Sequence, residues 1–322
     1  MRVAVVGAGA LGRIYGLRLA TAGRDHRVSF VVRPRRLAER GPFVLEEASG
    51  WERRDVLEPE RVAQPPADAD AVLLTVRCEQ VDAPLAEALA GVPARAPIVT
   101  LTPLFPREHA ALEHALARRV TSAMPGVNGY TDARGFIRYW VLPQPTLVDD
   151  PGQGSHARPA LAALCEALEG AGLPARLRPG VAALDAGSTT VLYPYIAAVG
   201  VAGSVRALAA DLALGRLTAR AGGECRALAR HVGEVAPWAE ALHRAFAPRW
   251  LRPGVAVAGA LFPEQLRFVD AHFGPKLVAQ HLSMGESVLA LAAEHDVAAP
   301  ALSELVARLR PQRVGEAGAR HA

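Results

Sequence analysis

The sequence has few of the residues on which metal centres and disulfide frameworks depend. Its three cysteines, Cys78, Cys165 and Cys225, are scattered and never form a C-x-x-C pair, which argues against a zinc cluster and against a disulfide framework. His109 and His114 are five residues apart, off the spacing that a helical metal site uses. We therefore expect reduced thiols and no bound metal.

Long apolar runs are also missing. No run approaches the roughly 18 residues that span a bilayer, and the opening "MRVAVVGAG" leads straight into a strand without the leader of an exported protein. These features predict a cytoplasmic protein without a membrane segment.

Lysine is nearly absent, because Lys276 is the single lysine among 36 cationic residues. The arginines alternate with Asp and Glu along helical segments, and the formal net charge is only +4. Such alternation is typical of a solvated surface and not of a nucleic-acid-binding stripe. We expect no nucleic-acid partner.

The first half of the chain alternates β-rich runs with helical patterns. A strand over 2–6 enters a glycine turn, the helix that follows ends at Gly23, and a second strand covers 27–32. Further strands are expected at 69–77, 96–103, 120–124, 135–142 and 145–150, with helices at 81–92 and 107–119. This order predicts βαβ units, that is, an α/β Rossmann domain with a doubly wound parallel sheet.

From residue 155 the pattern becomes helical, with Ser155 as the expected cap of the first helix. Pro179 and Gly180 mark the expected hinge. We predict an NADP-binding Rossmann domain over 1–179 and an all-α domain for substrate and dimer contacts over 180–310. Residues 311–322 lack an apolar face and are expected to be a disordered tail. The apolar length of the helical half favours a homodimer.

The stretch "VVGAGALGR" carries the main functional signal. Gly7, Gly9 and Gly12 form G-x-G-x-x-G directly after a strand and at the start of a helix. In that context the first glycine permits a tight turn, the second lets a pyrophosphate approach the backbone, and the third lets helix and strand pack closely. With Ala10 and Leu11 between them, these residues predict a dinucleotide site at a helix N-terminus.

The end of the second strand indicates which dinucleotide binds. An NAD site usually offers an Asp or Glu to the ribose 2′-hydroxyl there, whereas this chain reads "VVRPRR" with no acid until Glu39. Arg33, helped by Arg35 or Arg36, can hold a 2′-phosphate through charge-assisted hydrogen bonds. An ordinary basic loop is the alternative, mainly for Arg35 and Arg36. We predict NADPH as the cofactor.

These features together resemble the ketopantoate reductase family. The glycine loop in 4–23, Arg33, the segment "ADAVLLTVRCEQ" and the closing "GESVLALAAEHDVAAPAL" look like that family's glycine loop, NADP arginine, V-K-x-x-Q segment and last helices. The resemblance implies an NADPH-dependent reductase of a 2-keto acid with a Rossmann domain and a helical domain. It aligns Val76, Arg77 and Gln80 with the V-K-x-x-Q segment, as cofactor contacts.

The chain departs from the family at the positions that carry the chemistry. The segment's lysine falls on Arg77, which cannot serve as a proton donor because an arginine guanidinium stays protonated in proteins. Thr102, Pro103 and Leu104 stand where the family has Q-N-G, which leaves Thr102 as the cofactor contact of that loop. The glutamate before the last helices falls on Ala279.

The family's proton-donating lysine and two asparagines also have no counterpart here. Counting back from Pro194 puts Asp185, Thr189 and Tyr193 at their positions. Hydride transfer to a carbonyl needs a proton donor whose pKa lies near neutrality. Burial could supply that for Asp185, unless it is a helix N-cap.

Other residues are candidates as well. Tyr193 or His281 could donate a proton through a water, although Tyr193 beside a proline is equally explained by packing. Lys276 is a third candidate donor. Asn128, in the glycine-rich segment "PGVNGYTDARG", could close on the nicotinamide as a loop residue, or be a plain Asn-Gly turn.

Three functions remain open from the sequence. The first is an oxidoreductase that reduces a carbonyl of a small 2-keto-acid-like substrate between its two domains. That substrate would differ from ketopantoate, because the positions that would bind ketopantoate are replaced. The second is an NADPH-binding sensor or scaffold without turnover. The third is an imine or opine-type C–N reductase, since this architecture hosts many reactions.

Overall fold

The computed structural model describes residues 1–23, 26–48, 54–246, 248–274 and 277–310. The chain divides into two compact units, Met1–Thr189 with Val232–Ala236, and Thr190–His231 with Pro237–Ala322. The domain boundary predicted at 179 and 180 precedes this division, which falls inside a helix. Lys276 and the predicted tail at 311–322 lie outside the described residues.

The first unit is built on an eight-stranded sheet with the strand order β12-β11-β8-β7-β6-β1-β2-β5. Neighbouring strands are parallel except β11 and β8. Central strands are apolar on both faces, as expected for a sheet covered on both sides. The predicted Rossmann-like fold is confirmed. The strands are β1 (Arg2–Val6), β2 (Arg27–Val31), β5 (Glu60–Val62), β6 (Ala71–Leu74), β7 (Ile98–Thr100), β8 (Val120–Met124), β11 (Thr146–Asp149) and β12 (Ala175–Arg178).

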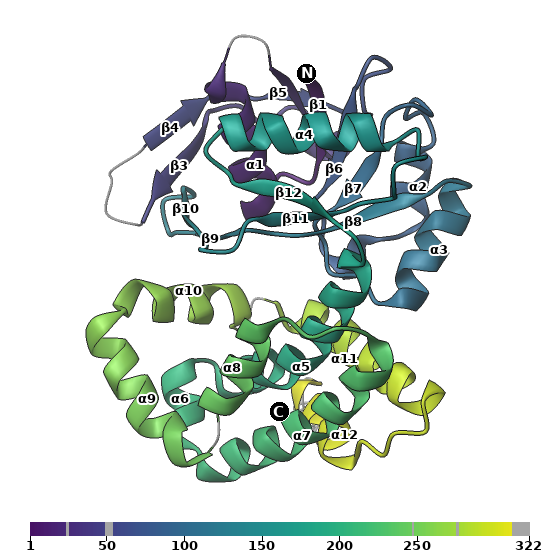
Figure 1. The fold of residues 1–322 in the computed structure, drawn as a ribbon. Helices are drawn as coiled ribbons and strands as arrows, with labels where there is room; N and C mark the ends of the chain where they lie inside the picture. The colour runs from purple at the N-terminus through teal and green to yellow at the C-terminus, as the bar shows by residue number, and fades with distance from the viewer. Residues whose placement is uncertain (24–25, 49–53, 247, 275–276, 311–322) are drawn as a thin grey trace, which may run out of the picture. The chain divides into compact units, whose positions relative to one another are not determined.

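Helices cover both faces of this sheet (Figure 1). On one face, α1 (Ala10–Ala22) and α4 (Arg158–Gly170) pack through Ile14, Leu17 and Leu164 into a core with Val5 and Phe30. On the other, α2 (Ala83–Leu89) and α3 (Pro106–Leu116) contribute Leu85, Leu89 and Leu112 to a second core. Two separate cores thus hold the sheet in place.

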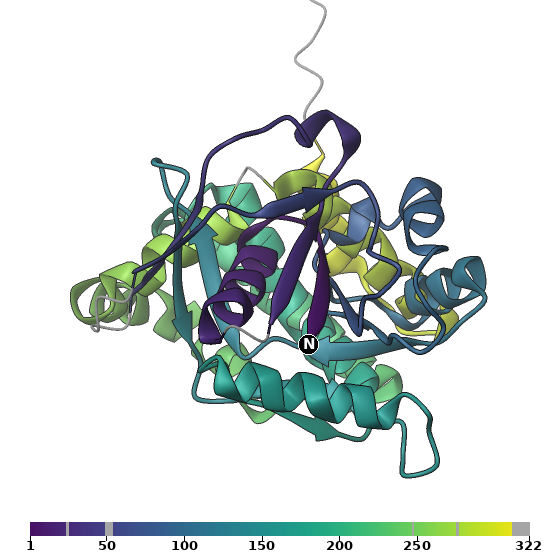
Figure 2. The same ribbon diagram turned by 90° about the horizontal axis from the view of Figure 1, so that it is seen from above.

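A four-stranded sheet that the sequence analysis did not foresee packs on α1. Its order is β4-β3-β10-β9, with β3 (Phe43–Glu47), β4 (Arg54–Leu57), β9 (Val127–Thr131) and β10 (Ile137–Val141). Figure 2 shows α1 between β9 and β10 on one side and the main sheet on the other. Only β10 matches a predicted strand.

Asn128 therefore lies on a strand and not in a loop. It belongs to β9 and pairs with Trp140 of β10. The glycine that follows serves packing, because a Cβ atom on Gly129 would lie 2.6 Å from Cδ1 of Ile14 on α1. The loop placement of Asn128 was wrong because the close approach of α1, rather than a turn, requires glycine at this point.

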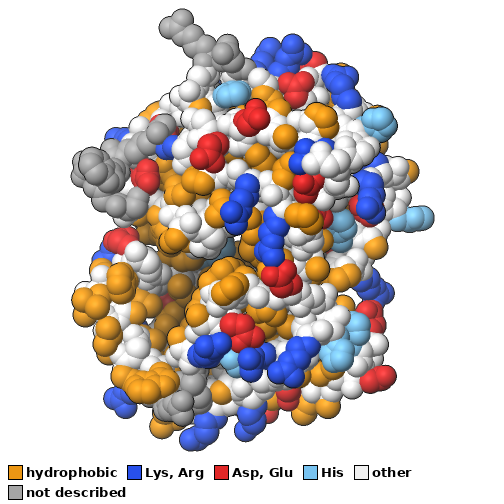
Figure 3. Space-filling model, in the orientation of Figure 1, with side chains coloured by type: hydrophobic (Ala, Val, Ile, Leu, Met, Phe, Trp, Pro, Cys, Tyr) orange, Lys and Arg blue, Asp and Glu red, His pale blue; other side chains and the backbone are white. Residues whose placement is uncertain are grey.

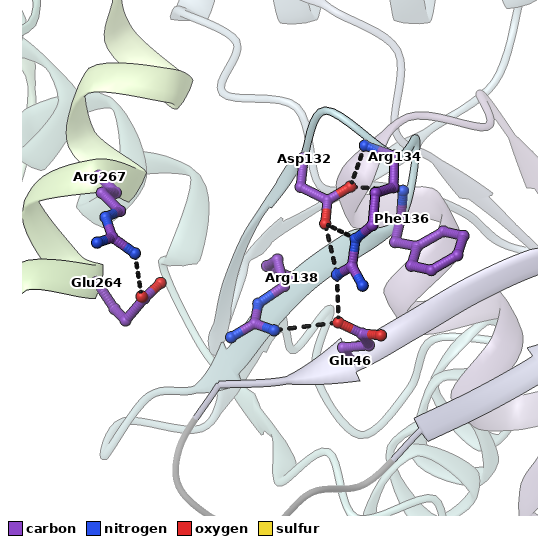
Figure 4. Close-up of polar contacts among 7 residues, drawn as sticks. All are labelled: Glu46, Asp132, Arg134, Phe136, Arg138, Glu264 and Arg267. Atoms are coloured by element: carbon purple, nitrogen blue, oxygen red, sulfur yellow. Dashed lines mark hydrogen bonds and ion pairs between the residues drawn. The ribbon is translucent and has the colours of Figure 1, made fainter.

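The turn between β9 and β10 is held by charged side chains (Figure 4). Asp132 accepts hydrogen bonds from the backbone N–H groups of Arg134 and Phe136, at 2.9 Å and 3.0 Å. The Arg134 guanidinium donates to Asp132 at 2.8 Å and to Glu46 of β3 at 2.7 Å, and Arg138 donates to the same Glu46 oxygen at 3.1 Å. These contacts fix the turn against β3.

Two local expectations near residue 155 also differ from the structure. Ser155 does not cap α4, which begins at Arg158 after Ala157; the Ser155 hydroxyl instead accepts from the Ala157 N–H at 3.3 Å. Residues 175–178 form strand β12 at the sheet edge, where a helical pattern was expected. Pairing with β11 overrides the local preference of this short arginine-rich segment.

The second unit is helical. It contains the last part of α5 (Val181–Ala202), then α6 (Val205–Ala210), α7 (Leu212–Val232), α8 (Pro237–Ala245), α9 (Pro248–Leu261), α10 (Pro263–Phe273), α11 (Val278–Glu294) and α12 (Pro300–Leu309). The predicted all-α C-terminal part is confirmed. Among the described residues, no helix combines the length and apolar character that crossing a membrane would require.

Candidate cofactor and active site

The turn from β1 into α1 needs glycine at its first position. Gly7 has φ +103°, in the left-handed region that favours glycine. A Cβ atom there would also lie 3.0 Å from the N atom of Val76 in the loop after β6. The turn is therefore tight and pressed against the neighbouring strand end.

Gly9 and Gly12 differ in what surrounds them. A Cβ atom on Gly12 would overlap the carbonyl oxygen of Gly7 and lie 2.6 Å from Oγ1 of Thr75. On Gly9 it would meet no atom of the described residues within 4 Å, and this glycine is exposed. The first packs helix against strand, and the second leaves an open approach to the backbone.

The N-terminus of α1 opens onto the same place. Gly9 caps the helix without a side-chain hydrogen bond, and the first turn contains no acidic residue. The first N–H groups of a helix, here those around Ala10 and Leu11, have no intrahelical acceptor and carry the positive end of the helix dipole. The start of α1 is open, its N–H groups receive no side-chain hydrogen bond from Gly9, and no acidic residue lies in its first turn. Such a helix start after a tight turn fits the pyrophosphate of a dinucleotide.

The loops after β6 and β7 are tied to this turn. The Thr75 hydroxyl oxygen lies within hydrogen-bonding distance of the carbonyl oxygens of Val6 and Gly7, at 3.0 Å and 2.8 Å. The Thr102 hydroxyl donates to the carbonyl oxygen of Val76. Because β1, β6 and β7 are adjacent and parallel, their carboxyl ends meet where ligands bind in open α/β sheets.

Arg77 and Gln80 shape the loop after β6. The Gln80 side-chain oxygen accepts from the backbone N–H of Arg77 at 3.3 Å, which closes a short 3-10 helix, Cys78–Gln80. The Arg77 guanidinium lies 3.3 Å from the Glu79 carboxylate and stays half-exposed. Arg77 therefore faces solvent, whereas its neighbour Val76 accepts the hydrogen bond from Thr102.

Arg33 and Arg36 lie where the sequence predicted the 2′-phosphate site. Arg33 is exposed, lies two residues after the end of β2 and immediately precedes the 3-10 helix Pro34–Arg36. Arg36 donates two hydrogen bonds to the Glu39 carboxylate, at 2.8 Å and 2.9 Å.

Two further arginines, neither of them predicted as a site residue from the sequence, approach this region. The Arg13 guanidinium lies 4.1 Å from the centre of the Phe43 ring, and that of Arg61 lies 4.9 Å from it. Arg13 directly follows Gly12, which was a signal available in the sequence. Arg61 is on β5, a strand that the analysis did not predict.

Asp185 is buried inside α5, with 8% of its surface exposed. The helix begins at Val181, so the alternative that Asp185 is an N-cap is wrong. Burial raises the pKa of Asp185 to about 7, because the charged carboxylate loses its hydration. Asp185 belongs to the same compact unit as the glycine turn.

Tyr193 and His281 meet inside the helical unit. The Tyr193 hydroxyl donates to the backbone carbonyl oxygen of His281 at 2.8 Å, and its ring is fully buried. Neither ring nitrogen of His281 has a hydrogen-bond partner among the described residues. Burial lowers the pKa of His281 to about 4, with a smaller contribution from His272. The donor roles of these two residues and of Lys276, which lies outside the described residues, stay predictions.

Residues 3–124 match the family model described as ketopantoate reductase PanE/ApbA. No curated protein shows significant sequence similarity to the chain.

Solved structures are similar over nearly the whole chain. A PanE/ApbA family ketopantoate reductase from Ralstonia eutropha JMP134 has a TM-score of 0.72 and 20% identity, covering 96% of this chain and 97% of that one. A 2-dehydropantoate 2-reductase from Geobacter metallireducens GS-15 has a TM-score of 0.68 and 18% identity, covering 96% and 99%. D-mandelate dehydrogenase with NADH and anilino(oxo)acetate has a TM-score of 0.66 and 14% identity, covering 96% and 97%. Residues 3–124 are therefore similar to the ketopantoate reductase PanE/ApbA family, and the chain has the fold of the solved ketopantoate reductases.

Proposed function

We propose that the protein is an NADPH-dependent oxidoreductase that reduces the carbonyl group of a small 2-keto-acid-like substrate. The observation that carries this proposal is the glycine turn, where Gly7 adopts a left-handed conformation, Gly12 admits the close helix and Gly9 leaves the backbone open. The family match of residues 3–124, which contain this turn, supports it.

The residues around the turn have distinct parts in holding the cofactor. The uncapped start of α1 would bind the pyrophosphate through its N–H groups. Arg33 and Arg36 would bind the 2′-phosphate with charge-assisted hydrogen bonds. Val76, with Thr102 hydrogen-bonded behind it, would line the cofactor where the loops after β6 and β7 meet. When bound, NADPH supplies a hydride.

Asp185 is the proton donor that we propose for the carbonyl oxygen. Its pKa of about 7, raised by burial, leaves a substantial protonated fraction at neutral pH. Arg77 cannot take this role, since an arginine side chain stays protonated in proteins. A buried carboxylic acid can thus replace an amine as the acid of the reaction.

We propose a substrate other than ketopantoate. Thr102, Leu104 and Tyr193 are bulkier or less polar than the family residues that they replace, which favours a larger and less polar ligand. The similar fold of D-mandelate dehydrogenase, solved with anilino(oxo)acetate, supports an aryl-substituted oxo acid as the first compound to try.

The test follows NADPH absorbance with the purified protein against aliphatic and aryl 2-keto acids and against imines. We expect oxidation with a 2-keto acid and a drop of at least tenfold in turnover for Asp185→Asn. Asp68→Asn is the matched control, because Asp68 pairs with Arg2 on the surface at the amino ends of the strands. Oxidation with imines alone would favour C–N reduction, and NADPH binding without any oxidation would favour a sensor or scaffold; either result would contradict the proposal.

We also propose a homodimer formed through the helical unit. Trp250, Val257 and Leu261 recur at helical spacing on α9 and are 57%, 57% and 65% exposed. Phe262 extends this face, and Figure 3 shows apolar side chains gathered over this part of the unit. A contiguous exposed apolar helix face is typical of a protein–protein contact, and a second copy of the chain can present the same face.

A further inference from the structure

Glu39 pairs with Arg36 and lies within the electrostatic influence of two further arginines, Arg61 and Arg13. Its two oxygens accept from Nε and Nη2 of Arg36, at 2.8 Å and 2.9 Å. The hydrogen bond from Arg36 lowers the pKa of Glu39, and the charges of Arg36, Arg61 and Arg13 lower it further. Three guanidinium groups therefore lie close enough to act on one acidic side chain.

Arg13 brings a positive charge that has no acidic hydrogen-bond partner among the described residues. Its Nε donates to the carbonyl oxygen of Ala8 at 2.9 Å and its Nη1 to that of Gly135 at 3.3 Å. Burial lowers the pKa of Arg13, and so do the neighbouring charges of Arg36 and Arg61. This residue is held between the glycine turn and the β9–β10 turn under like-charge repulsion.

Arg61 completes the cluster from the edge strand β5. Its side chain is only 7% exposed. It donates to the carbonyl oxygen of Gly41 at 2.9 Å and to the Glu58 carboxylate at 3.3 Å. The guanidinium lies against Phe43, as that of Arg13 does. The ring and the backbone carbonyl groups hold both cations in place without neutralising Arg13.

The position of the cluster matches one part of a dinucleotide. Arg13 follows Gly12, the last glycine of the glycine turn, and Arg36 lies in the 3-10 helix after β2. The end of this strand is where a dinucleotide-binding fold distinguishes a ribose 2′-hydroxyl from a 2′-phosphate. A carboxylate bound to a guanidinium by two hydrogen bonds uses the geometry that a phosphate uses. Glu39 thus occupies on Arg36 the place that a 2′-phosphate would take.

We propose that Glu39 sets the cofactor preference by competing with the 2′-phosphate for Arg36, with Arg13 and Arg61 supplying the excess positive charge that lets the phosphate win. This inference rests on the proposed function. A phosphate displaces the Glu39 carboxylate from Arg36, whereas a free 2′-hydroxyl leaves the Arg36–Glu39 pair intact. Glu39 therefore weakens binding of the phosphorylated ribose and does not weaken binding of the unmodified one.

Titration calorimetry with 2′,5′-ADP and 5′-AMP tests this competition without requiring turnover. We expect Glu39→Gln to raise the affinity for 2′,5′-ADP by about two- to fivefold, the range of an exposed ion pair, with 5′-AMP unchanged. Arg13→Gln should lower the affinity for 2′,5′-ADP only. Glu60→Gln is the matched control, because Glu60 forms a similar two-bond pair with Arg27, outside the cluster, and should change neither affinity.

The inference is overturned if Glu39→Gln leaves the affinity for 2′,5′-ADP unchanged, or raises both affinities equally. Thermal melts of each variant separate a binding effect from a folding effect. Because these ligands carry no nicotinamide, a failure to oxidise NADPH would count against the proposed reaction and leave this result standing. Conversely, if the wild type oxidises NADPH but Glu39→Gln binds 2′,5′-ADP with the affinity of the wild type, the inference about Glu39 is rejected and the proposed function is not.

Discussion

Gly12 lies so close to Gly7 that a Cβ atom on Gly12 would overlap the carbonyl oxygen of Gly7. This contact presses the first turn of α1 onto the end of β1. The position of the helix and the shape of the glycine turn therefore both depend on the contact.

Substitution of Gly12 by Ala should therefore harm folding and binding together. Overpacking of a close contact costs about 1–3 kcal/mol, and the helix can yield only by leaving the strand. Gly9→Ala is the informative comparison, because no atom of the part of the chain that the structure describes lies within 4 Å of its Cβ position. We expect Gly9→Ala to keep the stability of the wild type in urea unfolding and to lower NADPH affinity by at least tenfold. Equal affinity of Gly9→Ala and wild type would argue against a pyrophosphate at this turn.

Asp185 should make stability depend on pH in an unusual direction. Its pKa is about 7 in the folded protein and 3.8 in its ordinary state, so the folded state binds the proton more tightly. The free energy of unfolding then falls as pH rises from about 4 to about 7 and levels off above. The loss is on the order of 4 kcal/mol.

Urea unfolding at pH values from 5 to 8 measures this dependence. Asp185→Asn should flatten it and be more stable than the wild type at pH 8, while losing turnover. A wild-type slope that Asp185→Asn leaves unchanged would show that the carboxyl group is not desolvated as described.

Tyr193→Phe separates packing from catalysis at the Tyr193–His281 contact. The substitution removes one buried hydrogen bond, to a carbonyl oxygen at 2.8 Å, and should lower the free energy of unfolding by about 1 kcal/mol. We expect kcat within twofold of the wild type, since the hydroxyl proton is used in this bond. A loss of kcat of a hundredfold with normal stability would instead make Tyr193 the proton donor.

The exposed face of α9 should determine the oligomeric state. Leu261→Asp places a charge in the face that contains Trp250 and Val257, and sedimentation velocity should then show monomers where the wild type forms dimers. Leu212→Asp is the control, because Leu212 is 61% exposed but lies at the start of α7. A monomeric wild type would rule out this dimer.

The glycine turn could be predicted from the sequence because its requirements are local. A strand, three glycines and a helix start within twelve residues, and the structure has them in that order. Arg33 was within reach for the same reason, since it directly follows the strand expected at 27–32, and Arg36 lies three residues further on.

The second sheet and the arginine cluster depend on distant pairings that no local pattern reveals. Arg61 reaches Phe43 only because β5 pairs with β2 in a register that sets Arg61 opposite Phe30. The glycine-rich segment around Asn128 is typical of a loop or an Asn-Gly turn, whereas β9 needs Gly129 for the approach of α1. Burial of Asp185 likewise follows from tertiary packing and not from its neighbours in sequence.

The central claim is most directly tested by the binding of NADPH and NADH to the wild type, Arg33→Ala and Arg95→Ala, measured by titration calorimetry. Arg33 lies two residues after the end of β2, and Arg95, exposed in the loop before β7 at the amino ends of the strands, serves as the control. The account predicts that the wild type binds NADPH more tightly than NADH, and that Arg33→Ala loses about tenfold or more in NADPH affinity with little change for NADH, the effect of removing a charge-assisted phosphate contact. Equal losses for both cofactors, or no binding of either by the wild type, would contradict it.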